Sequence, residues 1–179
     1  MKILYAVQGT GNGHISRAME IVPILQKYCE LDILISGIQA DLDPGFMVTH
    51  RLKGMGFIFG KKGEVDLIQT FRKCISRGFI REIKQLPLKK YDLVINDFEP
   101  VSAWAARIQN VPCISLSHQF AVIHSASPKP DKTDWVGKMI MSNYSPVSSG
   151  FGFHFKPYAE TIFTPVIRSE VRNLSTSDG

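Results

Sequence analysis

The residues with the clearest chemical potential are a histidine and the glycines before it. Gly9, Gly11 and Gly13 lie in one turn, which follows the apolar run Lys2–Val7 and leads directly into His14. Glycines in such a turn permit positive φ and let backbone N–H groups approach an anion at a helix amino terminus. The pattern predicts strand, loop and helix, with His14 at the carboxyl end of the first strand, where open α/β sheets bind ligands.

An imidazole at a helix amino terminus is suited to act as a general base. The positive end of the helix dipole disfavours the imidazolium, so we expect His14 to be neutral near neutral pH. The alternative is a surface histidine that only caps the helix, because single histidines are seldom catalytic. Two further polar segments favour the chemical role.

Two carboxylates follow a later apolar run. Asp97 and Glu99 come directly after Tyr91–Asn96 and fall at the carboxyl edge of the expected sheet. A carboxylate there is placed to accept an imidazole N–H of His14, fix its tautomer and stabilise its protonated form. The alternative for Asp97 is capping of the helix expected at Val101–Ile108. For Glu99, capping is the favoured interpretation and substrate binding the second.

A polar cluster also ends the strand expected at Pro112–Leu116. His118 and Gln119 are predicted to contact a ligand at the same sheet edge. The alternative for His118 is a buried histidine that is bonded to the backbone.

The glycine turn fits neither common nucleotide-binding fingerprint. His14 occupies the place of the third glycine in G-x-G-x-x-G, and Ser36 and Gly37 stand where the second strand would end in an acidic residue. No Gly-Lys-Ser/Thr follows the glycines, which excludes a P-loop. We therefore expect no bound cofactor.

The elements that must position these side chains alternate along the chain. Short apolar runs indicate strands, and segments with helical apolar spacing lie between them. This alternation predicts an α/β protein with a Rossmann-like, doubly wound parallel sheet. The expected strands are Lys2–Val7, Leu31–Ser36, Met55–Phe59, Tyr91–Asn96, Pro112–Leu116 and Phe151–Phe155. The expected helices are one after the glycine turn that contains Pro23, a long basic one at Glu64–Lys84, and two more at Val101–Ile108 and Thr133–Asn143.

The composition is that of a globular domain. The chain has 179 residues, 44% of them hydrophobic, which predicts one domain over residues 1–170 and a linker over 171–179. No apolar run approaches the ~18 residues that cross a bilayer and no signal-peptide pattern begins the chain, so we expect a cytoplasmic protein. Cys29, Cys74 and Cys113 have no metal-ligand spacing, so we expect buried thiols and no metal site. The charge of +5 favours anionic partners, but no aromatic-basic pattern indicates nucleic acid.

Residues 9–18, with the sequence G-T-G-N-G-H-I-S-R-A, resemble the amino-terminal motif of GT-B glycosyltransferases. The peptidoglycan N-acetylglucosaminyltransferase and the monogalactosyldiacylglycerol synthases are members of that group. With Phe57–Asp66 and Asn96–Glu99, the chain is most similar to a branch of bacterial and archaeal predicted glycosyltransferases. The resemblance covers essentially the whole chain. It implies the amino-terminal, acceptor-binding half of a two-domain fold, whose second domain holds most contacts to a nucleotide sugar.

The resemblance also implies a mechanism and a set of residues. His14 would take the proton of an acceptor hydroxyl with Asp97 as its partner, while the sugar leaves a nucleoside diphosphate with inversion. The half-protein by itself is not expected to transfer sugar. His118 and Gln119 are similar to the His-Glu-Gln-Asn segment of the peptidoglycan enzyme, although its Glu and Asn are absent here. The substrate-binding residues expected from the motif are Gly11, Asn12, Gly13 and Arg17.

Alternative functions are a binding subunit of a split glycosyltransferase and the half-domain of a sugar-nucleotide 2-epimerase. The epimerase would need more carboxylates near its cleft than the sequence offers. Several related families act on lipid acceptors, and a basic and apolar surface here would suit an anionic membrane. Ordinary core packing is the alternative for these residues. They are Phe71–Lys90, Trp135, Met139, Ile140 and Met141.

Overall fold

The structure is a computed structural model, and it describes residues 1–37, 40–55, 77–128 and 135–175. Within these ranges, seven strands form one sheet in the order β3-β2-β1-β4-β5-β6-β7, and all neighbours are parallel. The sheet confirms the predicted α/β class and Rossmann-like parallel architecture. The strands are β1 (Lys2–Gln8), β2 (Glu30–Ser36), β3 (His50–Leu52), β4 (Leu93–Asp97), β5 (Cys113–Ser117), β6 (Gly150–Phe153) and β7 (Ile162–Phe163).

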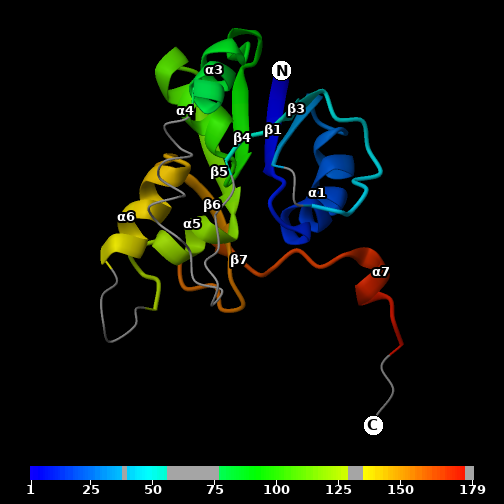
Figure 1. Cartoon of the computed structure of the whole chain (residues 1–179). Helices are drawn as coiled ribbons and strands as arrows, with labels where there is room; N and C mark the ends of the chain where they lie inside the picture. The colour runs from blue at the N-terminus through cyan, green and yellow to red at the C-terminus, as the bar shows by residue number, and fades with distance from the viewer. Residues whose placement is uncertain (38–39, 56–76, 129–134, 176–179) are drawn as a thin grey trace.

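Helices cover both faces of the sheet, as a doubly wound fold requires (Figure 1). The helix α1 packs on the face formed by β1 and β2, whereas α3, α4 and α6 contribute to the core on the other face. The helix α5 packs against β6. The helices are α1 (Asn12–Leu25), α3 (Arg77–Gln85), the 3-10 turn η1 (Leu88–Lys90), α4 (Pro100–Gln109), α5 (His118–Ile123), α6 (Trp135–Tyr144) and α7 (Ser169–Arg172).

The central strand β1 divides the apolar core into two layers. Successive side chains of a strand point to opposite faces, so Tyr5 and Val7 pack in the layer of α1 while Leu4 and Ala6 pack in the layer of α4. Asp97 pairs in register with Val7, so it also faces α1. The register of β1 and β4 therefore decides which helix Asp97 meets.

Most predicted elements are present within a few residues of their expected ends. The expected strand at Met55–Phe59 lies outside the described residues except for Met55, and so does most of the helix expected at Glu64–Lys84. The helix α3 overlaps the last residues of that expected helix. The short strand β3 was not predicted, because its three residues His-Arg-Leu form no apolar run. The helix α1 runs through Pro23 and ends shortly after it, at Leu25.

The glycines around the first turn have different structural roles. Gly9 N donates to Ser36 O at 2.6 Å, and Gly37 has φ +113°, with a Cβ there 2.7 Å from the carbonyl carbon of Gly9. Gly11 and Gly13 have no atom within 4 Å of an added Cβ, and neither has a positive φ. Positive φ therefore does not explain the glycines of the turn, whereas close packing explains Gly9 and Gly37.

We expect Gly37→Ala to lower the free energy of unfolding by about 1–3 kcal/mol, because a side chain there meets both backbone strain and a clash with Gly9. Gly13→Ala is the matched control. It adds a methyl group in open space within α1, where alanine is favoured over glycine by up to ~1 kcal/mol. Urea unfolding at equilibrium measures both, and equal effects would contradict the close approach.

Candidate functional site

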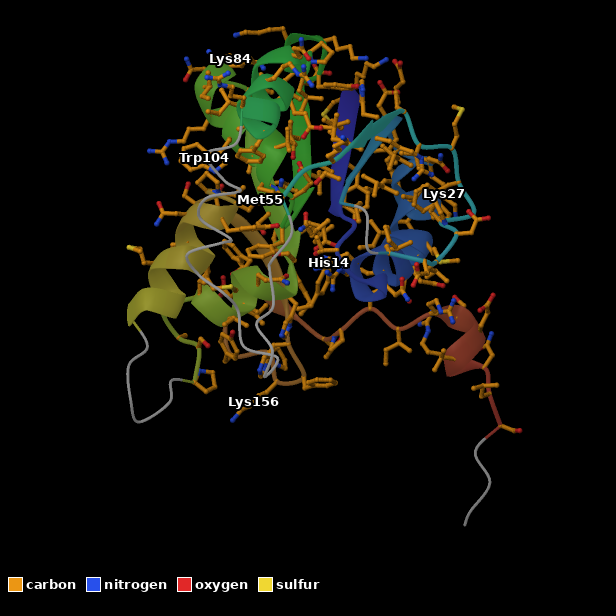
Figure 2. All side chains as sticks on the ribbon, viewed as in Figure 1. His14, Lys27, Met55, Lys84, Trp104 and Lys156 are labelled. Atoms are coloured by element: carbon orange, nitrogen blue, oxygen red, sulfur yellow. The ribbon has the colours of Figure 1, made fainter. Side chains whose placement is uncertain are left out.

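The site is centred on a histidine and an aspartate from opposite parts of the chain. The helix α1 begins at Asn12, so His14 lies in its first turn, and Asp97 is the last residue of β4. The Nδ1 atom of His14 is 3.0 Å from Oδ1 of Asp97. The expected contact between the two side chains is therefore present. Figure 2 shows His14 at the carboxyl end of β1, beside the start of α1.

Arg17 binds the same carboxylate from the next turn of α1. Its Nε donates to Oδ2 of Asp97 at 3.0 Å and its Nη2 donates to Oδ1 at 2.7 Å. The guanidinium also lies over the ring of Phe153, 5.4 Å from its centroid, and only 14% of the side chain is exposed. Arg17 thus forms an internal ion pair, and its predicted role in substrate binding stays a prediction. The spacing of three residues from His14 was the available signal, since such residues share a helix face.

Asp97 is ionised although water does not reach it. Its side chain is 0% exposed, and burial alone would raise its pKa. The interactions of Asp97 with His14 and Arg17 outweigh burial and hold the pKa of Asp97 below that of an ordinary aspartate. Asp97 in turn raises the pKa of Arg17 against the opposing effect of burial. The site therefore contains a stable buried ion pair.

Tyr5 lies beneath this ion pair on β1. Its side chain is fully buried, and its hydroxyl has no hydrogen-bond partner among the described residues. Burial, followed by the charge of Asp97, raises the pKa of Tyr5 well above its ordinary value. Tyr5 is therefore a neutral neighbour of the site.

Gln119 reaches the other nitrogen of His14. Its Nε2 is 3.4 Å from Nε2 of His14, and its Oε1 is buried without a hydrogen-bond partner among the described residues. The neighbouring His118 turns away, with Nδ1 2.6 Å from the carbonyl oxygen of Phe153. The alternative interpretation of His118 was a buried histidine that is bonded to the backbone. The bond to the backbone is present, but His118 is exposed.

Glu99 is a helix cap and does not face the site. Its carboxylate accepts from the backbone N–H groups of Val101 and Ser102 at 2.8 and 2.6 Å, and Ser36 Oγ donates to it at 2.6 Å. The side chain is 0% exposed, and burial raises its pKa although these hydrogen bonds oppose the rise. The capping interpretation is confirmed, and substrate binding by Glu99 stays a prediction.

Asn12 also has a local structural role. Its Oδ1 accepts from the backbone N–H groups of Asp41 and Leu42 at 3.1 and 3.3 Å, which ties the start of α1 to the loop after β2. The predicted role of Asn12 in substrate binding stays a prediction. The N-cap residue of α1 is Gly11, and no side chain there accepts from the first backbone N–H groups of the helix. These N–H groups are therefore left next to His14.

A cavity lies on the other side of the sheet from His14 and Asp97. It has a volume of about 760 Å³ and is bounded by α4, β5, α5 and α6. Cys113 lines this cavity, and burial raises the pKa of its thiol to about 12. Cys113 and Cys29 are both half-buried, so these two thiols are less buried than expected. The other lining residues are Ala103, Arg107, Val111, Phe120, Ile123, His124, Ser125, Ser142, Pro146, Val147 and Ser148.

Two kinds of feature are absent from the described part of the chain. None of its helices is both long and apolar enough to cross a membrane. Among the same residues, no group of three or more His, Cys, Asp or Glu side chains is arranged to hold a metal ion.

A Rossmann-like α/β domain with a His–Asp pair at the carboxyl edge of its sheet is the class that these observations define. The sequence profile of glycosyl transferase family 1 matches residues 1–179, so the chain belongs to that family. The match confirms the resemblance that the glycine motif predicted: the chain is a GT-B glycosyltransferase-like domain. No curated protein sequence matches the chain.

Solved structures with the same fold are about twice as long as this chain. A UDP-N-acetylglucosamine 2-epimerase aligns with 13% identity and a TM-score of 0.50, over 92% of this chain and 47% of its own. SsfS6, a glycosyltransferase of Streptomyces sp. SF2575, aligns with 15% identity over 88% and 51%, TM-score 0.47. MurG of Acinetobacter baumannii aligns with 14% identity over 98% and 50%, TM-score 0.47. The chain therefore spans about half the length of the structures it matches.

We expect Asp97→Asn to lower the free energy of unfolding by about 3 kcal/mol at neutral pH, because it leaves the buried charge of Arg17 unpaired. The pKa of Asp97 is lowered on folding, so its stabilisation is complete above the ordinary aspartate pKa and is lost as the pH falls through the lowered value. The difference in the free energy of unfolding between wild type and Asp97→Asn should therefore become smaller in acid. Urea unfolding across pH measures this.

Asp41→Asn is the matched control, because Asp41 is exposed and the change should stay within about 0.5 kcal/mol. An Asp97→Asn variant as stable as this control would show that the ion pair does not contribute to folding.

Proposed function

We propose that the chain is the acceptor-binding domain of an inverting glycosyltransferase, with His14 as the general base. The parent would transfer a sugar from a nucleoside-diphosphate sugar to a hydroxyl group. The single observation that carries this proposal is the 3.0 Å contact between His14 Nδ1 and the buried carboxylate of Asp97. A histidine held in this way by a carboxylate has its second ring nitrogen available for proton transfer.

The proposed reaction follows from this arrangement. Nδ1 of His14 keeps its proton and donates a hydrogen bond to Asp97, while Nε2 of His14 accepts the proton of the acceptor hydroxyl. The hydroxyl oxygen forms a bond to the anomeric carbon as the bond from that carbon to the diphosphate oxygen breaks, which inverts the configuration. The imidazolium that results is stabilised by the negative carboxylate of Asp97, whose Oδ1 accepts a hydrogen bond from Nδ1 of His14.

Gln119 and the glycine turn support a substrate beside His14. The Gln119 amide nitrogen lies 3.4 Å from Nε2 of His14, which supports a role for this side chain beside the attacking hydroxyl. Gly11 and Gly13 place no side chain at the start of α1, where a phosphate oxygen is favoured by the helix dipole. In this proposal, the turn assists the departing diphosphate.

The donor would be held mainly by the rest of the parent protein. This chain spans about half the length of the structures it matches, so we do not expect it to transfer sugar alone. A binding subunit of a split enzyme would require a separate catalytic chain for any turnover. An epimerase would interconvert a sugar nucleotide without an acceptor, so assays with and without acceptor distinguish these alternatives.

We expect His14→Gln in the full-length parent to lower kcat for sugar transfer by about 10²–10⁴-fold, which is the usual contribution of a general base. The assay offers a panel of sugar nucleotides with soluble and lipid acceptors. His50→Gln is the matched control, because His50 lies on β3, two strands away from β1, and should leave kcat unchanged. Full transfer by His14→Gln would remove His14 from the reaction.

A lipid acceptor would bring the parent to a membrane surface. Arg81 and Lys84 are exposed on α3, and Met139 on α6 is 53% exposed, which supports contact with anionic lipid. Of the apolar side chains of α3, Phe79 and Ile83 are buried in the core, whereas Ile80 is 41% exposed. We expect salt-sensitive flotation with anionic liposomes that is weakened by Arg81→Gln/Lys84→Gln. No retention by anionic liposomes would end this proposal.

A further inference from the structure

The most constrained group at the site is a guanidinium that the proposed reaction does not use. We propose that Arg17 is a positioning residue, which holds the proton of His14 on Nδ1 through its hydrogen bonds to Asp97. This inference rests on the proposed role of His14 as base. It replaces the substrate-binding role that the motif suggested for Arg17.

Three atoms meet in a tight triangle at the site. Nη2 of Arg17 and Nδ1 of His14 lie 2.7 and 3.0 Å from the same oxygen, Oδ1 of Asp97, and 3.1 Å from each other. A carboxylate oxygen accepts several hydrogen bonds, so it suits two donors. If Nδ1 carried no proton, it could accept from Nη2 of Arg17 at 3.1 Å, but its lone pair would also face the negative carboxylate oxygen at 3.0 Å. At the other side of the ring, Nε2 of Gln119 lies 3.4 Å from Nε2 of His14 and can only donate to it. The contacts with Asp97 and Gln119 together favour the tautomer with the proton on Nδ1 and an unprotonated Nε2.

Arg17 is needed for this tautomer because Asp97 is buried. Without a neighbouring cation, burial favours the neutral, protonated form of a carboxyl group. A protonated Asp97 would be able to donate to Nδ1 of His14, and the ring would then carry its own proton on Nε2. In that state Nε2 cannot take a proton from a hydroxyl. By keeping Asp97 ionised, Arg17 keeps the reactive nitrogen of His14 unprotonated.

Arg17 also fixes the direction of the carboxylate. Its bond from Nε to Oδ2, together with the bond from Nη2 to Oδ1, is a two-point contact that resists rotation of the Asp97 side chain. The guanidinium itself is held against the ring of Phe153 on β6. The groups around this ion pair are the neutral Tyr5 on β1 and His14 on α1. Arg17 thus directs its guanidinium to side chains of the protein itself, Asp97 and Phe153.

Nitrogen NMR of the histidine rings in this 179-residue chain tests the inference without requiring turnover. At one alkaline pH, wild type should show His14 with Nδ1 protonated and Nε2 unprotonated. Arg17→Gln should show a mixture or the opposite tautomer. Arg17→Lys keeps the charge without the two-point contact and should lie between them. Lys27→Gln, which removes a cation from the segment after α1, should match wild type.

Kinetics of the full-length parent give the second measurement. Arg17→Gln should lower kcat by about 10²-fold, in the lower range of a general-base contribution, with KM little changed. A substrate-binding Arg17 would instead raise KM and leave the NMR pattern of His14 as in wild type, and that result would overturn the inference. If Arg17→Gln does not fold, Arg17→Lys carries the test, since it still neutralises Asp97.

The two proposals fail in different ways. A changed tautomer in the Arg17 variants, with full transfer by His14→Gln, would retain the positioning role and remove the base. An unchanged tautomer, with transfer lost in His14→Gln, would retain the base and remove the positioning role.

Discussion

A carboxylate without access to water determines how the first helix meets the sheet. Asp97 ends β4 with 0% exposure, and a buried charge is tolerated only when donors inside the protein satisfy it. His14 and Arg17, three residues apart on α1, supply these donors from one face of the helix. This requirement brings the face of α1 that carries His14 and Arg17 against the end of β4.

One tight turn separates two carboxylates into different roles. Phe98 has φ +58°, an uncommon conformation for a residue with a side chain, and it lies between Asp97 and Glu99. Asp97 faces α1 on one side of the sheet, whereas Glu99 caps α4 and accepts from Ser36 on the other side. Two acidic residues that are separated by one position in the sequence therefore have different hydrogen-bond partners. The strained turn is part of what keeps Asp97 available to His14.

The glycines of the first loop show a similar division between packing and access. Gly9 lies against the end of β2, where Gly37 approaches its backbone too closely for a side chain. Gly11 and Gly13 have open space around them and lie beside His14. The first pair brings the ends of β1 and β2 together, and the second pair leaves the start of α1 accessible. This difference cannot be read from a row of glycines, because it depends on what β2 places next to each one.

The sequence by itself determined the parallel α/β sheet and the meeting of His14 with Asp97. Alternating apolar runs and helical spacing predict such a sheet, and the carboxyl ends of its strands must share one edge. Capping by Glu99 was also the favoured interpretation of the sequence. Only the tertiary structure decided that Arg17 would bind Asp97 and that Glu99 would accept from Ser36. Those outcomes depend on the register of β4 against β1 and on which face each side chain takes. Residues 80 positions apart meet there, and no local pattern encodes their contact.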